Sequence, residues 1–196
     1  TVDDSAEITM FIRHYWLSTK KKITENKLFR EIKKDPISNY ESFLGDLVNE
    51  ALLYKMIIDP NSSDWDKENL DVYKTLNRIK ALNVRQSRSI LLTLLRMIND
   101  NSFWSNSGSA DIKKTLVLIE NFTFCFSSIC RKSPSALENI YSKYSISLNE
   151  EYLKNNKHTK DNIEKILKEF KNKLMEIYPT LNEFKDNFVK LEYKQS

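Results

Sequence analysis

Hydrophobic residues recur along most of this chain at the spacing of an amphipathic helix. Near the N-terminus, the residues at the i, i+3, i+4, i+7 positions of one helix face are Ile8, Phe11, Ile12 and Tyr15. We expect a first helix over about residues 4–18.

Capping residues and prolines divide the next stretch into two more predicted helices. Thr24 can cap a short helix that must stop near Pro36, because proline clashes with the preceding turn. Ser38 and Glu41 have the spacing of a capping box, which opens a third helix that ends at Asp59-Pro60. The apolar residues of this third helix are Phe43, Leu44, Leu47, Ala51, Leu52 and Met56.

The middle of the chain holds its most apolar segment. After a polar loop at 61–64, a helical pattern covers about 70–82. The stretch Ile90–Ile98 is then apolar nearly all round, so it should form a central helix that is covered on most sides.

A Ser- and Asn-rich run at 101–109 is the best candidate for an internal loop. We predict one domain over 1–196, with this run as the place where it could be subdivided. The following residues, 116–129, fit a long helix, although Phe122, Phe124 and Phe126 also alternate as in a strand. Helix is favoured because no partner strand is visible nearby.

The C-terminal part repeats the helix signals. Ser133-Pro134 should open a helix, and Ser147 with Glu150 has capping-box spacing. A clear amphipathic pattern covers 163–177, and Thr180 with Glu183 suggests one more capping box after Pro179. The whole pattern predicts an all-α, compact, bundle-like domain of about eight to ten helices.

Composition argues against catalysis within the chain. Two glycines, Gly45 and Gly108, cannot build a glycine-rich phosphate loop. Two histidines cannot supply a zinc site or an HNH-type nuclease centre, and we interpret Cys125 and Cys130 as reduced, buried packing residues. Acidic pairs such as Asp161 with Glu164 fit a solvated helix face. We therefore predict no catalytic residue, no metal site and no cofactor in this chain.

The formal charge of +4 permits a nucleic-acid partner without arguing strongly for one. The chain has neither a secretory signal nor a run of about 18 uncharged apolar residues. We expect a cytoplasmic protein with no membrane contact.

Three basic clusters are candidates for an interface with DNA or with a neighbouring domain. Arg13 and His14 precede two large aromatic residues; they lie either at the rim of the core or against phosphate or another domain. Arg85 and Arg88 flank the predicted start of the most apolar helix, where an anion would be favoured, although Ser87 could simply cap that helix.

The third cluster, Arg131-Lys132, has the same arrangement before Ser133-Pro134 and could equally be a solvated loop.

Several segments taken in order resemble the helical centre of GmrSD-type modification-dependent DNA restriction endonucleases. These segments are Ile12-Arg13-His14-Tyr15-Trp16-Leu17-Ser18, Lys27-Leu28-Phe29-Arg30, Leu82-Asn83-Val84-Arg85-Gln86, Glu120-Asn121-Phe122-Thr123-Phe124 and Arg131-Lys132-Ser133-Pro134. The resemblance spans about 8–144 and implies a role in restricting phage DNA.

In that family an N-terminal ParB-like domain with a D-G-Q-Q-R-type motif is implied to bind and hydrolyse nucleotide, and a C-terminal domain carries an HNH-type nuclease. This chain contains neither motif, so nucleotide and divalent metal are expected only in other domains of the parent protein. The resemblance implies a connector between those domains, with the flanking domains and DNA as partners.

Two other hypotheses remain open at this point. One is a purely structural module that contacts only protein. The other is a helical enzyme with a carboxylate-bound metal.

Overall fold

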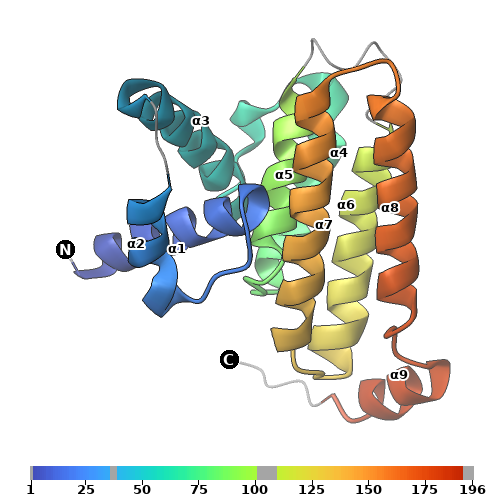
Figure 1. Ribbon diagram of the computed structural model, residues 1–196. Coiled ribbons are helices and arrows are strands. Elements are labelled where there is room, and N and C mark those ends of the chain that lie inside the picture. Colours follow the sequence, from blue (N-terminus) through green and yellow to red (C-terminus); the bar gives the residue numbers. More distant parts are fainter. Residues whose placement is uncertain (1, 36–38, 101–109, 192–196) are drawn as a thin grey trace.

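Four long helices form an up-down-up-down bundle in the computed structural model (Figure 1). The structure describes residues 2–35, 39–100 and 110–191, with side chains from residue 6. They are α5 (Arg88–Asn99), α6 (Ala110–Thr123), α7 (Ser135–Lys154) and α8 (Thr159–Met175). Helix α5 contacts α6 and α7, and α8 contacts the same two helices, so the four close a ring around one core.

The N-terminal helices lie against one side of this bundle (Figure 1). Helix α1 (Val2–Thr19) contacts both α5 and α7, while α3 (Tyr40–Ile58) contacts α1, α5 and α4 (Leu70–Ala81). The short α2 (Glu25–Lys34) packs on α1. The remaining elements are η1 (Ser62–Asp64), η2 (Lys67–Asn69), η3 (Phe124–Ile129) and α9 (Leu181–Phe188).

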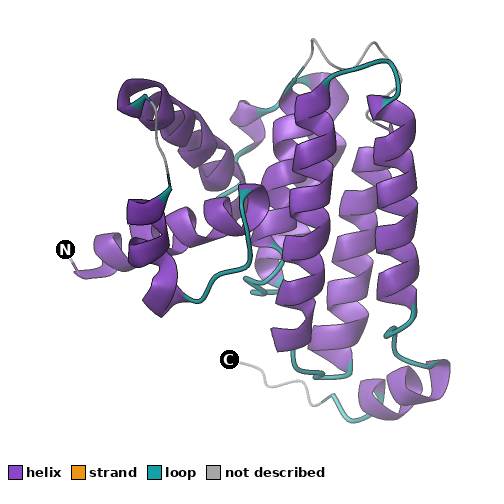
Figure 2. Ribbon diagram, in the orientation of Figure 1, coloured by secondary structure: helices purple, strands orange, loops and turns teal. Residues whose placement is uncertain are grey.

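The described residues form helices joined by loops and turns, with no strand, as Figure 2 shows; the all-α prediction is confirmed. The prediction of a central helix is confirmed as well, because every residue from Ser89 to Leu95 is buried. Helix α5 is covered by α1, α3, α6 and α7, which explains why its sequence is apolar on all sides.

The strand alternative for Phe122–Phe126 is wrong. Helix α6 continues into η3, a π-helical turn closed by a bond of 3.0 Å from the Cys130 amide to the Cys125 carbonyl. Cys125 and Cys130 are free thiols and half-buried, so they are less enclosed than we predicted.

The capping predictions had mixed outcomes. Thr180 and Glu183 form the predicted capping box at α9. The cap of α3 is Asn39, whose side-chain oxygen accepts from the Ser42 amide at 3.1 Å, while Ser38 falls outside the described residues. A helix start at Ser147 is wrong because α7 runs through that position. The predicted subdivision at 101–109 also falls outside the described part of the chain.

Candidate functional site: an arginine pocket between helices α1, α3 and α5

A pocket of about 660 Å³ lies where α1, the end of α3 and the start of α5 meet. Arg85 and Arg88, which the sequence analysis gave as interface candidates, both line this pocket. The full lining is Ala6, Glu7, Met10, Tyr54, Lys55, Ile58, Asp59, Arg85 and Arg88. We call this the arginine pocket.

The two arginines are held differently. The Nη1 of Arg88 donates to the Tyr54 hydroxyl at 3.1 Å and lies 3.4 Å from the Met10 sulfur, and its guanidinium carbon lies 5.7 Å from the centre of the Tyr54 ring. Arg85 is exposed, and its Nη1 lies 4.0 Å from the Met10 sulfur. Among the described residues neither arginine has a carboxylate partner.

The charges around the pocket leave an excess of cations. Lys55 adds a third positive charge, whereas the acidic residues are Glu7 and Asp59. Asp59 is already paired with Lys80, at 2.8 Å between Nζ and Oδ1, and this contact lowers the pKa of Asp59 below its usual value. The positive side chains therefore exceed the carboxylates available to neutralise them.

His14 lies beneath the pocket and contributes no charge to it. Its ring is 3% exposed, with Nδ1 2.8 Å from the Tyr54 hydroxyl oxygen. Burial first, and then the nearby positive charges of Arg88, Arg13 and Arg85, lower the pKa of His14 from 6.5 to about 3. The ring is neutral at pH 7. It can accept the Tyr54 proton, so a relay of hydrogen bonds runs from Arg88 through Tyr54 to His14.

This buried neutral histidine should make the fold sensitive to mild acid. In the unfolded chain His14 takes up a proton near pH 6.5, whereas the folded chain resists it down to about pH 3, so stability falls as pH decreases through this window. Between pH 7 and pH 5 we expect a loss of about 2 kcal/mol from this group. Urea denaturation at both pH values measures it, and His14→Gln should remove most of the difference. An equal difference in the variant would contradict this assignment.

Arg13 is next to His14 in sequence but is engaged elsewhere. It forms a two-pronged ion pair with Glu138, with Nη2–Oε1 and Nη1–Oε2 distances of 2.6 and 3.0 Å. Both side chains are mostly buried. Arg13 thus fastens α1 to the first turn of α7. Its carboxylate partner has no equivalent at Arg85 or Arg88 among the described residues.

Arg131 and Lys132 lie at a separate site, next to α9. Arg131 is exposed and has a left-handed backbone, with φ of 50°. Lys132 pairs with Glu183 at 2.9 Å and lies 5.8 Å from the centre of the Phe126 ring. The structure therefore brings Arg85, Arg88 and His14 together and leaves this third cluster apart.

Ser87 occupies the N-cap position of α5 but does not cap it. Its backbone is in the right-handed helical region, and its buried hydroxyl has no hydrogen-bond partner. The interpretation of Ser87 as an ordinary capping residue is therefore wrong.

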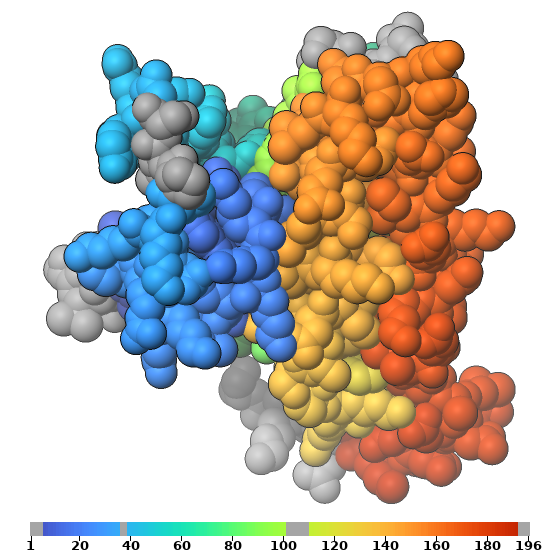
Figure 3. Space-filling view, in the orientation of Figure 1, coloured from blue at the N-terminus to red at the C-terminus, as the bar shows by residue number. Residues whose placement is uncertain are grey.

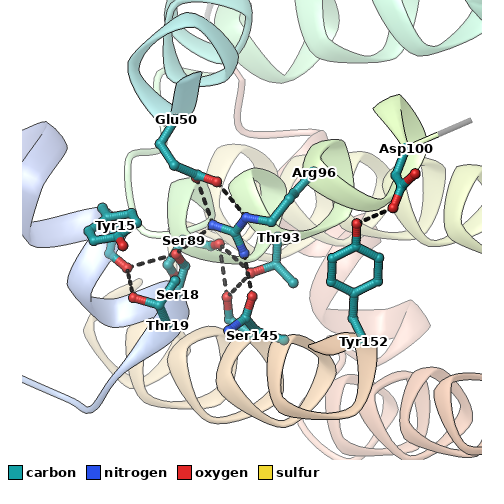
Figure 4. Close-up of polar contacts among 11 residues, drawn as sticks. Tyr15, Ser18, Thr19, Glu50, Ser89, Thr93, Arg96, Asp100, Ser145 and Tyr152 are labelled. Atoms are coloured by element: carbon teal, nitrogen blue, oxygen red, sulfur yellow. Dashed lines mark hydrogen bonds and ion pairs between the residues drawn. The ribbon is translucent and has the colours of Figure 1, made fainter. Parts of the chain in front are cut away.

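A second polar cluster, which the sequence did not reveal, is mostly buried and is drawn in Figure 4. Arg96 of α5 holds both oxygens of Glu50 from α3, at 2.5 and 2.7 Å, and donates to the Asn149 side chain of α7 at 2.7 Å. It also reaches the Ser18 hydroxyl of α1 at 3.5 Å. We call these four residues the Arg96 junction, because one side chain connects α5 to three other helices.

Neighbouring hydroxyls extend the contact between α5 and α7 (Figure 4). The Ser145 hydroxyl donates to the Ser89 carbonyl at 2.9 Å and shares a hydrogen bond of 2.6 Å with Thr93. The Tyr152 hydroxyl of α7 donates a further bond to Asp100, the residue that follows α5. Arg96, the one charged residue within the stretch Ile90–Ile98, was the available sequence signal for this junction.

Among the described residues no group of three or more histidine, cysteine or acidic side chains could hold a metal ion. None of the described helices is long and apolar enough to cross a bilayer. Comparison of the chain with known protein families, curated proteins and solved structures found no match. The GmrSD-type resemblance therefore stays a prediction from the residues that carry it.

Proposed function

We propose that this chain is a non-catalytic helical connector of a GmrSD-type DNA restriction endonuclease, and that its arginine pocket binds a phosphate of DNA. One observation carries the proposal. Arg85 and Arg88 line the same pocket, and neither is neutralised by a carboxylate among the described residues.

The chemistry of the pocket fits a phosphate group. Arginine offers planar donors that match the oxygens of phosphate, and its charge is not lost at any physiological pH. Tyr54 holds the Arg88 guanidinium in place, so less side-chain entropy is lost on binding. Both arginines also lie at the start of α5, where the helix dipole favours an anion.

The packing of α5 supports a connector role. The arginine pocket lies at its first turn and the Arg96 junction near its last, so a single buried helix joins the proposed DNA contact to α1, α3 and α7. Helices that are packed and bonded in this way move as one body. A rotation of a flanking domain would thus be transmitted along α5.

Fluorescence anisotropy with a labelled DNA duplex at low salt tests the phosphate contact. We expect Arg85→Ala/Arg88→Ala to weaken binding about 10-fold or more, since two charge-assisted contacts are lost. A matched control, Arg30→Ala/Lys157→Ala, removes two exposed cations outside the candidate clusters and should change affinity much less. Equal effects of the two pairs would reject the pocket as the DNA site.

The alternative, a module that contacts only protein, is favoured by a different observation. Helix α3 carries an apolar face that nothing in the described structure covers. Wild-type protein that binds no DNA at low salt would favour this alternative.

A further inference from the structure

The outer face of α3 is apolar and exposed. Four residues spaced four apart lie along it, each 60–70% exposed: Tyr40, Leu44, Val48 and Leu52. The opposite face, which includes Tyr54 and Ile57, packs into the core. Figures 1 and 3 show α3 standing beside the bundle at the upper left. We call these four residues the α3 stripe.

Helix α3 is therefore apolar on two faces, and only one of them packs into the core. Leu44, Ala51 and Leu52 belong to the exposed side, whereas Phe43 and Leu47 are partly buried against the core. Exposed apolar patches of this kind commonly mark protein contacts.

Gly45 beside the stripe makes no close packing contact with the described residues. A side chain added there would meet no atom within 4 Å. Glycine inside a helix costs about 1 kcal/mol relative to alanine, and no close packing contact among the described residues offsets that cost. A small residue next to large ones allows a second helix to approach closely.

Tyr40 has no exposed counterpart across Val48, because Met56 packs against the core, but the other residues of this face match one another. Leu44 and Leu52 lie four residues to either side of it, Gly45 and Ala51 lie three, and Glu41 and Lys55 lie seven. When two copies of one helix pack antiparallel about a two-fold axis, residues equally distant from the centre face each other. Each leucine would then meet a leucine, each glycine an alanine, and each glutamate a lysine.

The charges add independent support for this arrangement. Among the described residues neither Glu41 nor Lys55 takes part in an ion pair. In the antiparallel pair Glu41 of one copy faces Lys55 of the other at both ends of the contact. A parallel pair would instead place like charges together, which is unfavourable.

We propose that the α3 stripe binds the same stripe of a second copy, giving a two-fold dimer of antiparallel α3 helices. The contact from Glu41 to Lys55 is about 21 Å long at 1.5 Å per residue. A single helix pair is smaller than the standard interface of about 1,600 Å², so we expect a dissociation constant in the micromolar range. This inference does not rest on DNA binding.

Sedimentation velocity over a range of concentrations tests the dimer. We expect the wild type to shift from monomer to dimer in the micromolar range, and Val48→Glu to remain a monomer, because two carboxylates would meet at the axis. Val189→Glu, just after α9 at a position that is 79% exposed, is the matched control and should still form dimers. A wild type that stays monomeric throughout, or a Val48→Glu dimer, overturns the proposal.

Charge-reversal variants test the antiparallel register at exposed positions, where a substitution should not disturb the fold. Glu41→Lys and Lys55→Glu should each weaken the dimer several-fold, and the two together should restore it. A double variant no stronger than either single one would contradict the antiparallel register.

Cross-linking tests whether the two α3 helices are antiparallel. The experiment uses a chain in which Cys125 and Cys130 are replaced by alanine. A short bismaleimide should link Leu44→Cys chains to Leu52→Cys chains when the two are mixed. Leu44→Cys alone should link poorly, since the two copies of residue 44 would lie about 12 Å apart along the axis. The reverse result would indicate a parallel pair and overturn the proposal.

Discussion

Replacing Arg96 with alanine is expected to lower the free energy of unfolding by about 3–5 kcal/mol, one of the two largest effects that we predict. The substitution leaves the Glu50 carboxylate buried without its partner, since the Glu50 side chain is only 10% exposed. It also removes the donor to the Asn149 side chain. Urea denaturation monitored by circular dichroism at 222 nm measures the loss.

The matched control removes both charges together. Glu50→Leu/Arg96→Met should cost far less than Arg96→Ala, because no buried charge is left unpaired. If the double variant were as unstable as the single one, the Arg96 junction would contribute through packing and not through its ion pair. A loss below about 1 kcal/mol for Arg96→Ala would show that the pair is effectively solvated.

Replacing Phe170 with alanine should cost about 3–5 kcal/mol as well. The ring is fully buried on α8, with its centre 5.3 and 6.0 Å from the ring centres of Tyr144 and Tyr141 on α7. Its removal leaves a cavity between the two helices, and the aromatic contacts are lost.

Leu153→Ala on α7 is the control for Phe170→Ala, because Leu153 is exposed and its removal should change stability by less than about 0.5 kcal/mol. Equal denaturation midpoints for the two variants would mean that α7 and α8 do not share the core described here.

Local patterns in the sequence were sufficient to predict the fold class. The apolar stretch Ile90–Ile98 predicted the buried α5, and Thr180 with Glu183 predicted the cap of α9. These signals succeed because each depends on residues within a few positions of one another. The same reasoning misplaced a helix start at Ser147, where the spacing of a capping box occurs by chance inside α7.

The contacts that build the site could not be predicted in the same way. The Arg96–Glu50 pair joins residues 46 positions apart, and the Arg13–Glu138 pair joins residues 125 apart. Helical periodicity gives the face on which a residue lies, but not the helix that packs against that face. For the same reason it did not show that the α3 stripe would be left uncovered.

The candidate arginines illustrate this limit. Arg13, Arg85 and Arg88 looked equivalent in the sequence as basic residues at or near helical segments. The fold gives Arg13 a carboxylate and leaves the other two facing the arginine pocket. The position of Tyr54, which orients Arg88 and contacts His14, had no signal in the sequence at all.

The salt dependence of DNA binding tests the phosphate contact most directly. In a plot of the logarithm of the association constant against the logarithm of salt concentration, each phosphate contact adds about 0.9 to the slope on duplex DNA. We predict that Arg85→Ala/Arg88→Ala reduces the magnitude of the slope by about 0.9 relative to wild type, because one phosphate contact is lost, and that the Arg30→Ala/Lys157→Ala control leaves it nearly unchanged. Parallel lines for wild type and Arg85→Ala/Arg88→Ala would contradict the account.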